Sequence, residues 1–240
     1  MTRRRWIADA WTATTASLTG DQATHLARVL RAEPGQIYDV VSNGFLHRAE
    51  ILTVSDDEVL FTLHEELSSD AALPLHLLLA VFKFDHMEWA IEKATELGIA
   101  KITPILARRT EKHLAQSALK RAERWRRITL EASKQSRRTT IPEIADPTTL
   151  KSALENENSP TRILLSETEQ TLTLTAALKA TTPSRETDTA LAIGPEGGWT
   201  PEEMSLFTTH QWQPVTLGPR ILRAETAAIA AIAIASTHLI

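Results

Sequence analysis

The stretch Thr189-Ala190-Leu191-Ala192-Ile193-Gly194-Pro195-Glu196-Gly197-Gly198 joins an apolar run to a glycine-rich corner. Residues 189–193 have the length and composition of a strand buried in a parallel sheet, and the glycines let the backbone turn sharply and approach a ligand closely. A helix start follows, since Thr200 is a good N-cap, Pro201 suits the first helical position and Glu203 completes a capping box. The corner is therefore predicted to lie beyond the carboxyl end of a strand, where open α/β sheets bind ligands.

A second corner follows, Leu217-Gly218-Pro219-Arg220-Ile221-Leu222-Arg223-Ala224-Glu225-Thr226-Ala227, between a predicted strand at 214–217 and a predicted helix at 223–237. Two such corners in succession predict one ligand site. Residues 227–235 are all alanine or isoleucine, and a helix that is hydrophobic all round is normally buried. The run is far shorter than the ~20 apolar residues that a membrane span needs. Either its own domain or a second subunit must enclose this helix, and we predict a homodimer with the helix in its interface.

The length and composition set the class of protein. A chain of 240 residues fits one large or two small domains, and we favour two. It has no cysteine, which excludes a disulfide framework, a thiolate metal site and a cysteine nucleophile. The basic start, residues 1–6, is not followed by an apolar segment of signal-peptide length, and no long apolar run occurs elsewhere. We therefore expect a cytoplasmic protein that binds no membrane, and no His/Asp spacing predicts a metal site.

Charge is unevenly distributed along the chain. The net charge is −4, but residues 101–140 hold twelve Lys or Arg against three Glu. A basic segment in an otherwise acidic chain is typical of local contact with phosphates, while the acidic remainder limits nonspecific binding. A solvated helix face explains the same run of charge, and this pattern does not separate the two interpretations.

The chain divides into a predicted β domain at 1–70 and an α/β domain at 75–240. The first has a short helix at 22–30, with Asp21 as a possible cap, and strand-like runs that suggest a barrel. Those strands are predicted at 36–41, 45–54 and 58–63. Residues 68–74 are small and polar, end in proline and read as a linker.

Strands and helices alternate in the second part. A strand is predicted at 75–82, a helix that begins with Asp85 and Glu88 as a capping pair, and a strand at 99–106. The basic helix is predicted at 116–136. Further strands are expected at 162–166 and at the two corners, whereas the threonine-rich residues 168–188 give no clear pattern.

Five segments together resemble one known family. They are the two corners, the run from His25 to Arg31 followed by Pro34-Gly35, the run from Met87 to Ile99, and Pro142-Glu143-Ile144. They closely resemble the ribosomal small subunit RNA methyltransferase E family, a branch of the SPOUT methyltransferases. The resemblance implies an enzyme of rRNA processing and ribosome biogenesis that uses S-adenosylmethionine to methylate N3 of a uridine in 16S rRNA, free or in the small ribosomal subunit. It also implies a PUA-like β-barrel for RNA binding, a C-terminal deep trefoil knot and an obligate homodimer.

The resemblance, together with the charge pattern of the basic helix, indicates which residues form the sites. The cofactor is expected at the two corners and a neighbouring strand end, at Leu165, Gly194, Glu196, Gly197, Gly198, Leu217, Gly218 and Leu222. RNA contacts are expected from the N-terminal signature and the basic helix, at His25, Arg28, Arg31, Arg124, Arg127, Arg137 and Arg138. Solvated helix-surface positions explain the same residues from the sequence pattern alone.

The chemistry directs attention to three charged residues of the second corner. Uridine N3 is a weak nucleophile while it holds its proton, so a base, or a cation that favours the deprotonated pyrimidine, is expected. Arg220 or Arg223 suits the cation, and Glu225, or Glu196 in the first corner, suits a proton acceptor or an ordering role. Glu225 also fits simple helix-terminal electrostatics, and Arg220 with Glu196 fits a structural ion pair.

One departure from the family keeps two other functions open. The family usually has Glu-Gln-Ser-Gly-Arg where this chain has Lys134-Gln135-Ser136-Arg137-Arg138, which removes a carboxylate and a glycine near the expected site. A catalytically silent RNA-binding protein of the same fold is one alternative. A phosphate-handling enzyme is another, because a glycine-rich turn that opens a helix binds anions, but the chain lacks the Gly-Lys-Ser/Thr ending of a P-loop and the Gly-x-Gly-x-x-Gly spacing.

Overall fold

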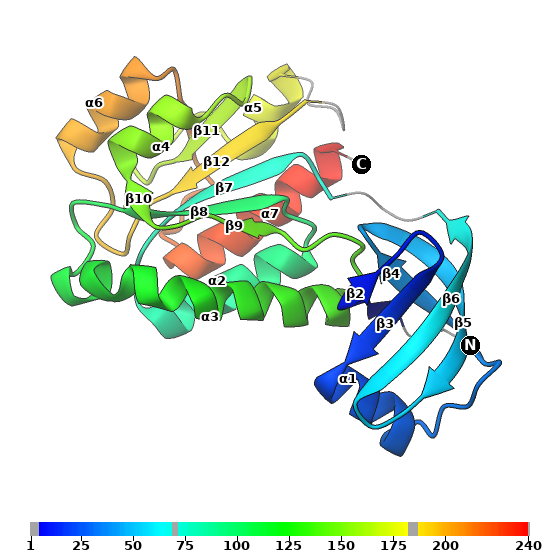
Figure 1. The fold of residues 1–240 in the computed structure, drawn as a ribbon. Helices are drawn as coiled ribbons and strands as arrows, with labels where there is room; N and C mark the ends of the chain where they lie inside the picture. The colour runs from blue at the N-terminus through cyan, green and yellow to red at the C-terminus, as the bar shows by residue number, and fades with distance from the viewer. Residues whose placement is uncertain (1–4, 69–71, 182–186, 240) are drawn as a thin grey trace. The chain divides into compact units, whose positions relative to one another are not determined.

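The chain folds into two compact units. The computed structural model describes residues 5–68, 72–181 and 187–239. One unit comprises Met1–Ala71 with Ser133–Thr140, and the other comprises Ala72–Ala132 with Ile141–Ile240. Figure 1 shows a β-rich N-terminal unit and an α/β C-terminal unit, each of which we describe separately.

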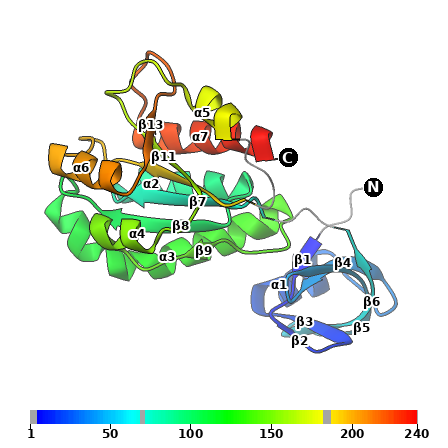
Figure 2. The ribbon, with the colours of Figure 1, turned by 90° about the horizontal axis from the view of Figure 1, so that it is seen from above.

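The N-terminal unit is built on a curled, mixed six-stranded sheet (Figure 2). Its strands are β1 (Arg5–Ile7), β2 (Ala10–Trp11), β3 (Thr15–Thr19), β4 (Ile37–Ser42), β5 (Phe45–Val54) and β6 (Glu58–Leu67). Their order is β1-β4-β5-β6-β3-β2, and only β1 pairs with its neighbour in parallel. The β5–β6 ladder shifts register twice, and such irregularities increase strand twist and help a sheet to curl around its own core.

Part of this unit was predictable. The strands expected at 36–41, 45–54 and 58–63 are confirmed as β4, β5 and β6. The expected helix is instead a short α1 (Gly20–Thr24) that continues as a π-helix, η1 (His25–Val29). The Asp21 cap was wrong, since Thr19 is the N-cap residue and Asp21 lies in the first turn.

The C-terminal unit contains a sheet in which every described strand pair is parallel. Its strands are β7 (Leu75–Ala80), β8 (Lys101–Leu106), β9 (Glu143–Ile144), β10 (Thr148–Thr149), β11 (Thr161–Leu165), β12 (Thr189–Ile193) and β13 (Gln213–Val215). The order is β10-β8-β7-β12-β11-β13, and β9 pairs with β8 off this path. Strand β12 lies in the middle with all five residues buried, as expected for a strand covered on both faces.

Helices cover both faces of this sheet (Figures 1 and 2). They are α2 (Phe84–Glu96), α3 (Lys112–Ser136), α4 (Leu150–Asn156), α5 (Leu174–Thr181), α6 (Pro201–Thr209) and α7 (Ala224–Leu239). Leu77 and Leu79 of β7 join a core with α2, α3, α5 and α7, whereas Leu78 joins a core with α4 and α6. The alternation along one strand therefore assigns each helix to a face.

Helix α2 packs directly against the C-terminal helix, α7. Met87, Ile91 and Ala94 are buried on its inner side, and Gly98 ends the helical segment with a φ of +97°. The expected capping pair of Asp85 and Glu88 was wrong, because the helix begins at Phe84 with Lys83 as its N-cap residue and no side-chain cap.

At the amino ends of the strands, a buried polar cluster joins three segments. Nε2 of His76 in β7 lies 2.9 Å from Oγ1 of Thr103 in β8, and Nδ1 of the same ring contacts the carboxylate of Glu157. Glu157 follows α4 and also accepts a hydrogen bond of 2.8 Å from the Ser159 amide. Burial raises the pKa of Glu157, but hydrogen bonds from His76 and Ser159 outweigh it and hold that pKa at about 2.

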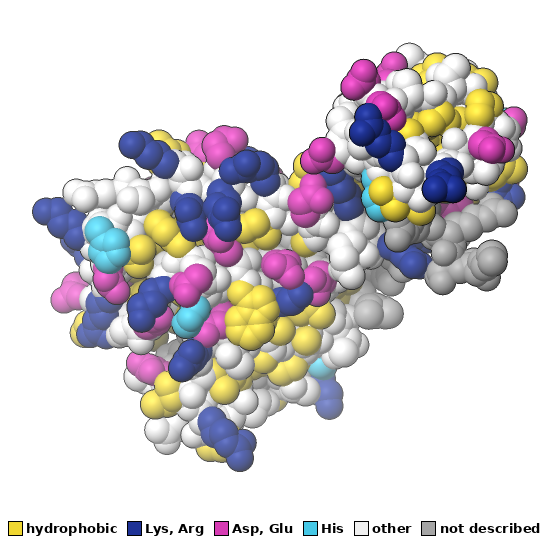
Figure 3. Space-filling view, turned by 90° about the horizontal axis from the view of Figure 1, so that it is seen from below, with side chains coloured by type: hydrophobic (Ala, Val, Ile, Leu, Met, Phe, Trp, Pro, Cys, Tyr) yellow, Lys and Arg dark blue, Asp and Glu magenta, His cyan; other side chains and the backbone are white. Residues whose placement is uncertain are grey.

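The C-terminal helix is only partly covered by its own unit. The chain leaves β13 at one edge of the sheet and returns as α7 to pack beside α2, α5 and β12. Ala228, Ile232 and Ala235 are buried, whereas Ile229 and Ile234 on another side of the helix are half-exposed. Figure 3 shows an exposed apolar area over α2 and α7. Among the described residues, no helix combines the length and the apolar character that a membrane span requires.

Candidate active site

A large cavity lies at the carboxyl ends of β11, β12 and β13. Its volume is about 1010 Å³, at the upper end of the ~300–1,000 Å³ typical of small-molecule sites. Three loops that follow these strands form it, at residues 166–170, 194–199 and 216–223, and the first residues of α7 close it. The two corners identified in the sequence therefore line one cavity, as expected.

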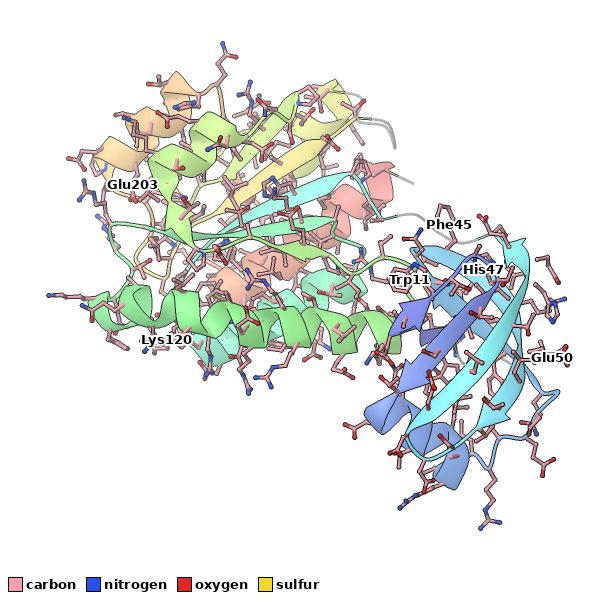
Figure 4. The ribbon with its side chains drawn as sticks, viewed as in Figure 1. Trp11, Phe45, His47, Glu50, Lys120 and Glu203 are labelled. Carbon is pink, nitrogen blue, oxygen red and sulfur yellow. The ribbon has the colours of Figure 1, made fainter. Side chains whose placement is uncertain are left out.

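Side chains of α6 and the loop after β8 hold the first corner. Thr200 and Glu203 form the predicted capping box, and the structure confirms it at distances of 2.9 Å and 3.3 Å. The buried Glu203 carboxylate also accepts a hydrogen bond of 2.8 Å from the Arg108 amide. Figure 4 labels Glu203 near the start of α6. One carboxylate thus connects the end of the glycine-rich corner to the loop after β8.

The three glycines of this corner differ in how strictly their backbone conformation and their surroundings exclude a side chain. Gly198 has a φ of +70°, and a Cβ there would lie 2.8 Å from Oε1 of Glu167. Gly194 faces the Trp199 indole, whose Nε1 would lie 3.0 Å from an added Cβ. Gly197 has no positive φ, and its Cβ would meet the flexible Arg109 side chain at 3.3 Å. Gly198 is therefore the position at which backbone conformation most strictly requires glycine.

The second corner is a tight turn with an apolar inner side. Thr216 Oγ1 accepts a hydrogen bond of 3.1 Å from the Gly218 amide, and Gly218 has a φ of +118°. Leu217 and Leu222 are half-buried and line the cavity. Ile221, next to Leu222 in the chain, also lines the cavity but is 85% exposed.

A third loop, which the sequence pattern did not reveal, closes the cavity from the β11 side. Glu169 accepts hydrogen bonds from the Thr171 hydroxyl at 2.7 Å, the Thr171 amide at 2.8 Å and the Leu172 amide at 2.9 Å. These bonds, led by the one from the Thr171 hydroxyl, lower the pKa of Glu169 to about 2. Glu169 thus orders the loop as an ionised cap, although it is exposed.

A buried carboxylate lies behind the cavity wall. Glu225, in the first turn of α7, is 2% exposed and does not line the cavity. Its Oε1 lies 3.3 Å from Nδ1 of His86, and its Oε2 has no hydrogen-bond partner among the described residues. His86 and Lys83, from the start of α2, do line the cavity. The sequence reasoning missed both, because a charged first turn of a helix carries no signal of a site.

Most of the expected site residues meet at this cavity. Seven of the eight residues expected to bind the cofactor line it, namely Leu165, Gly194, Glu196, Gly198, Leu217, Gly218 and Leu222. Gly197 instead lines a smaller neighbouring cavity. Arg220 and Arg223 line the large cavity as exposed side chains. No ion pair joins Arg220 to Glu196 in the part of the chain that the structure describes.

Two of the residues expected to bind RNA lie on α3. Nε of Arg124 is 2.9 Å from Oε1 of Glu88 on α2, and Nε of Arg121 is 2.7 Å from the same oxygen. Arg127 is exposed, and the structure gives it no ion pair or hydrogen bond among the described residues. Of these arginines, Arg127 is therefore better placed than Arg124 to receive a phosphate.

The other expected RNA contacts lie in the N-terminal unit. His25 packs against Trp6 with ring centroids 5.9 Å apart, and Arg28 forms an exposed 2.6 Å ion pair with Asp56. Arg31 is exposed with a φ of +48°.

Residues 133–140, at the end of α3 and just after it, belong to this unit and include Lys134 and Arg137, which replace the family's usual Glu and Gly. Arg137 is exposed with a φ of +61°, and its carbonyl accepts a 2.9 Å hydrogen bond from the Arg5 guanidinium. Arg138 is half-buried, and burial lowers its pKa to about 10. Its Nε donates a hydrogen bond of 3.1 Å to the Thr140 carbonyl.

Comparison with known proteins relates this chain to RNA methyltransferases. Residues 69–236 match the RNA methyltransferase domain family. The ribosomal RNA small subunit methyltransferase E of Synechocystis is 38% identical over 91% of this chain and 72% of its own length, and that of Bacillus subtilis is 32% identical over 92% and 89%.

Two solved structures cover nearly the whole chain. The ribosomal RNA small subunit methyltransferase E of Neisseria gonorrhoeae bound to S-adenosylmethionine has a TM-score of 0.83, with 27% identity over 99% of this chain and 98% of that one. A putative methyltransferase of Legionella pneumophila, in complex with the same cofactor, has a TM-score of 0.81, with 28% identity over 99% and 98%.

Proposed function

Because this chain belongs to the ribosomal RNA small subunit methyltransferase E family, we propose that it uses S-adenosylmethionine to methylate N3 of a uridine in 16S rRNA. The observation that carries the proposal is the cavity of about 1010 Å³ that three strand-end loops form around the two glycine corners. Structural relatives with this fold are described as bound to S-adenosylmethionine, which supports the same cofactor here.

The walls of the cavity suit this cofactor. Leu165, Leu217 and Leu222 offer apolar surface for a flat adenine ring, and the backbone of Gly194 and Gly198 is accessible without side chains. When bound, the cofactor supplies a methyl group already activated by its sulfonium charge. The protein then has to hold the acceptor in line and manage its charge.

The chain's own charged groups suit that second task. Arg220 and Arg223 line the cavity at the second corner, where a guanidinium stabilises negative charge on a uracil that has lost its N3 proton. Glu225 is buried behind the wall and does not reach the acceptor. Its role in this proposal is to orient His86, which lies 3.3 Å away and lines the cavity.

Positioning of the RNA is assigned to the N-terminal unit and to α3. The curled sheet of the N-terminal unit supports a PUA-like barrel, with His25, Arg28 and Arg31 as its contacts. Arg127, and to a smaller extent Arg124, would meet phosphates from α3, and Arg137 and Arg138 follow that helix. Such contacts position RNA and carry no sequence information of their own.

The path of the C-terminal segment supports two further parts of the proposal. The chain goes from β13 at the sheet edge through the second corner to α7 beside α2 and β12, a return that suits the deep trefoil knot of a SPOUT methyltransferase. Ile229, Ile234 and the 49% exposed Trp89 form an apolar surface on α7 and α2. Pairing with a second copy in a cytoplasmic homodimer would bury it.

The test is methylation of 16S rRNA and of small ribosomal subunits with a labelled methyl donor, followed by nucleoside mass spectrometry. The expected product is 3-methyluridine, and Arg223→Ala should lower turnover in a way that added RNA does not restore. A protein that binds the RNA but neither binds S-adenosylmethionine nor transfers a methyl group would be the catalytically silent alternative, and the proposal would be wrong.

A further inference from the structure

A second, smaller cavity adjoins the large one on the other side of the glycine-rich corner. Its volume is about 170 Å³. It lies at the carboxyl ends of β7 and β8, and three residues line both cavities, namely Lys83, Pro195 and Glu196. The two cavities therefore adjoin at these residues.

The smaller cavity has apolar and polar walls. Arg109, Thr110 and Glu111 line it from the loop after β8, and most of its surface is polar; Val81, Phe82 and Leu114 are buried in the core and contribute only a small apolar part. Its volume is well below the ~300 Å³ at which pockets begin to enclose a whole small ligand. It suits one flat ring with polar edges and not a complete nucleoside.

Hydrogen bonds between loops hold these walls in place. The Thr110 hydroxyl donates a hydrogen bond of 2.8 Å to the Val81 carbonyl, which joins the loops after β8 and β7. The Arg109 guanidinium donates to the Gly197 carbonyl, which joins the loop after β8 to the glycine corner. The cavity is thus built from tied backbone segments, which is what a pocket for a defined ring requires.

Lys83 provides an unpaired cation where the cavities meet. It is exposed, and the structure gives its ammonium no ion pair or hydrogen bond with any described residue. Its backbone is the N-cap of α2, but its side chain has no capping role. An unpaired charge between two cavities is available to a ligand that reaches from one into the other.

We infer that the smaller cavity is the acceptor pocket for the target pyrimidine, with Lys83 contacting the polar edge of the ring at the junction. The inference rests on the proposed function, because methyl transfer requires an acceptor atom next to the cofactor and in line with it. An enzyme that modifies a base extrudes it from the RNA into a pocket, and the pocket must be small and adjacent. The polar lining then meets the edge of the ring, and Lys83 favours negative charge there.

The first experiment fills the cavity. Leu114→Trp places a large ring from α3 into the space, and Leu119→Trp, at a 62% exposed position of the same helix, is the matched control. The variant at 114 should lose binding of uridine 5′-monophosphate, followed by NMR saturation transfer, and should lower kcat/KM for 16S rRNA by about tenfold or more. Calorimetric affinity for S-adenosylmethionine should stay within about twofold, since the filled space lies outside the large cavity.

The second experiment removes the cation without filling the core. Lys83→Ala should weaken uridine 5′-monophosphate binding by about tenfold, the size expected for one charged hydrogen bond, and Lys83→Arg should restore most of it. This exposed position keeps the test valid if Leu114→Trp does not fold. A folded Leu114→Trp protein with normal kcat/KM, or a Lys83→Ala protein with normal nucleotide binding, would overturn the inference.

Other outcomes separate the inference from the proposed function. Loss of S-adenosylmethionine binding in Leu114→Trp would make the small cavity part of the cofactor site and would overturn the inference alone. If the unmodified protein does not form 3-methyluridine, the proposed function is wrong before any variant is made. If it methylates another base, the N3 assignment is wrong, while the comparison of Leu114→Trp with Leu119→Trp still decides whether this cavity receives that base.

Discussion

Gly198→Ala is the substitution for which the structure predicts the clearest effect on the cofactor site. Gly198 has a φ of +70°, and an L-residue in the left-handed region costs roughly 1–2 kcal/mol. An added Cβ would also lie 2.8 Å from Oε1 of Glu167, so that side chain must move. If the loop relaxes out of this conformation in the free protein, it must return to it when the cofactor binds, and the binding free energy becomes less favourable by the same amount. A loss of 1–2 kcal/mol corresponds to about 5- to 30-fold in Kd.

The assay is calorimetric titration with S-adenosylmethionine, together with thermal unfolding without ligand. Gly197→Ala is the matched control, because Gly197 has no positive φ and its Cβ would meet only the flexible Arg109 side chain, at 3.3 Å. We expect it to change Kd by less than about threefold. Gly198→Ala should also be made in a Glu167→Ala background. The backbone strain at position 198 persists in this double variant, whereas the contact between the added Cβ and the Glu167 carboxylate disappears. Normal affinity and normal unfolding temperature in Gly198→Ala would refute the reasoning.

Three further predictions concern other parts of the molecule. Sedimentation should give twice the chain mass of 26.6 kDa, and Trp89→Glu, on the exposed apolar surface, should give a monomer; a monomeric unmodified protein that methylates RNA would exclude the dimer. Arg127→Ala should reduce the logarithmic salt slope of RNA binding by roughly 0.7–0.9, and Arg124→Ala by less, because Glu88 already neutralises Arg124; equal slopes would show that the ion pair does not matter. Glu157 has a pKa lowered to about 2, so its ionised form stabilises the fold above about pH 4.5, and this contribution, up to about 3 kcal/mol, is lost as the pH falls toward 2. Glu157→Gln should therefore flatten the dependence of unfolding free energy on pH in that window, and an unchanged acid-unfolding curve would contradict the assignment.

Local patterns in the chain were sufficient for several elements. The run at 189–193 forms a fully buried strand, and Thr200, Pro201 and Glu203 begin the following helix as predicted. Lys93 and Glu96, three positions apart in one helix, form an ion pair of 2.8 Å. These features depend on hydrogen bonds and contacts between residues a few positions apart, so the sequence of one segment is enough to specify them.

Two of the predicted helix caps were wrong because an acidic residue is favourable at more than one position of a helix start. Asp21 and Asp85 both looked like helix caps, yet each lies inside the first helical turn. The helix at Phe84 begins one residue after its N-cap, Lys83, whose side chain makes no cap. Acidic residues are favourable both at a cap and in a first turn, so their presence locates a helix start only to within a few residues.

The arrangement of the site came from strand order. The parallel order β8-β7-β12-β11-β13 brings the carboxyl ends of segments more than a hundred residues apart to one edge of the sheet. That order places Lys83 and His86 beside the two corners, puts Glu225 behind the cavity wall, and leaves Gly197 facing a second cavity. It likewise pairs Arg124 with Glu88, which changes an apparent RNA contact into a partly neutralised one. Sequence periodicity specifies which face of each element is apolar, but pairing between distant strands depends on the energy of the assembled sheet, which no single segment contains.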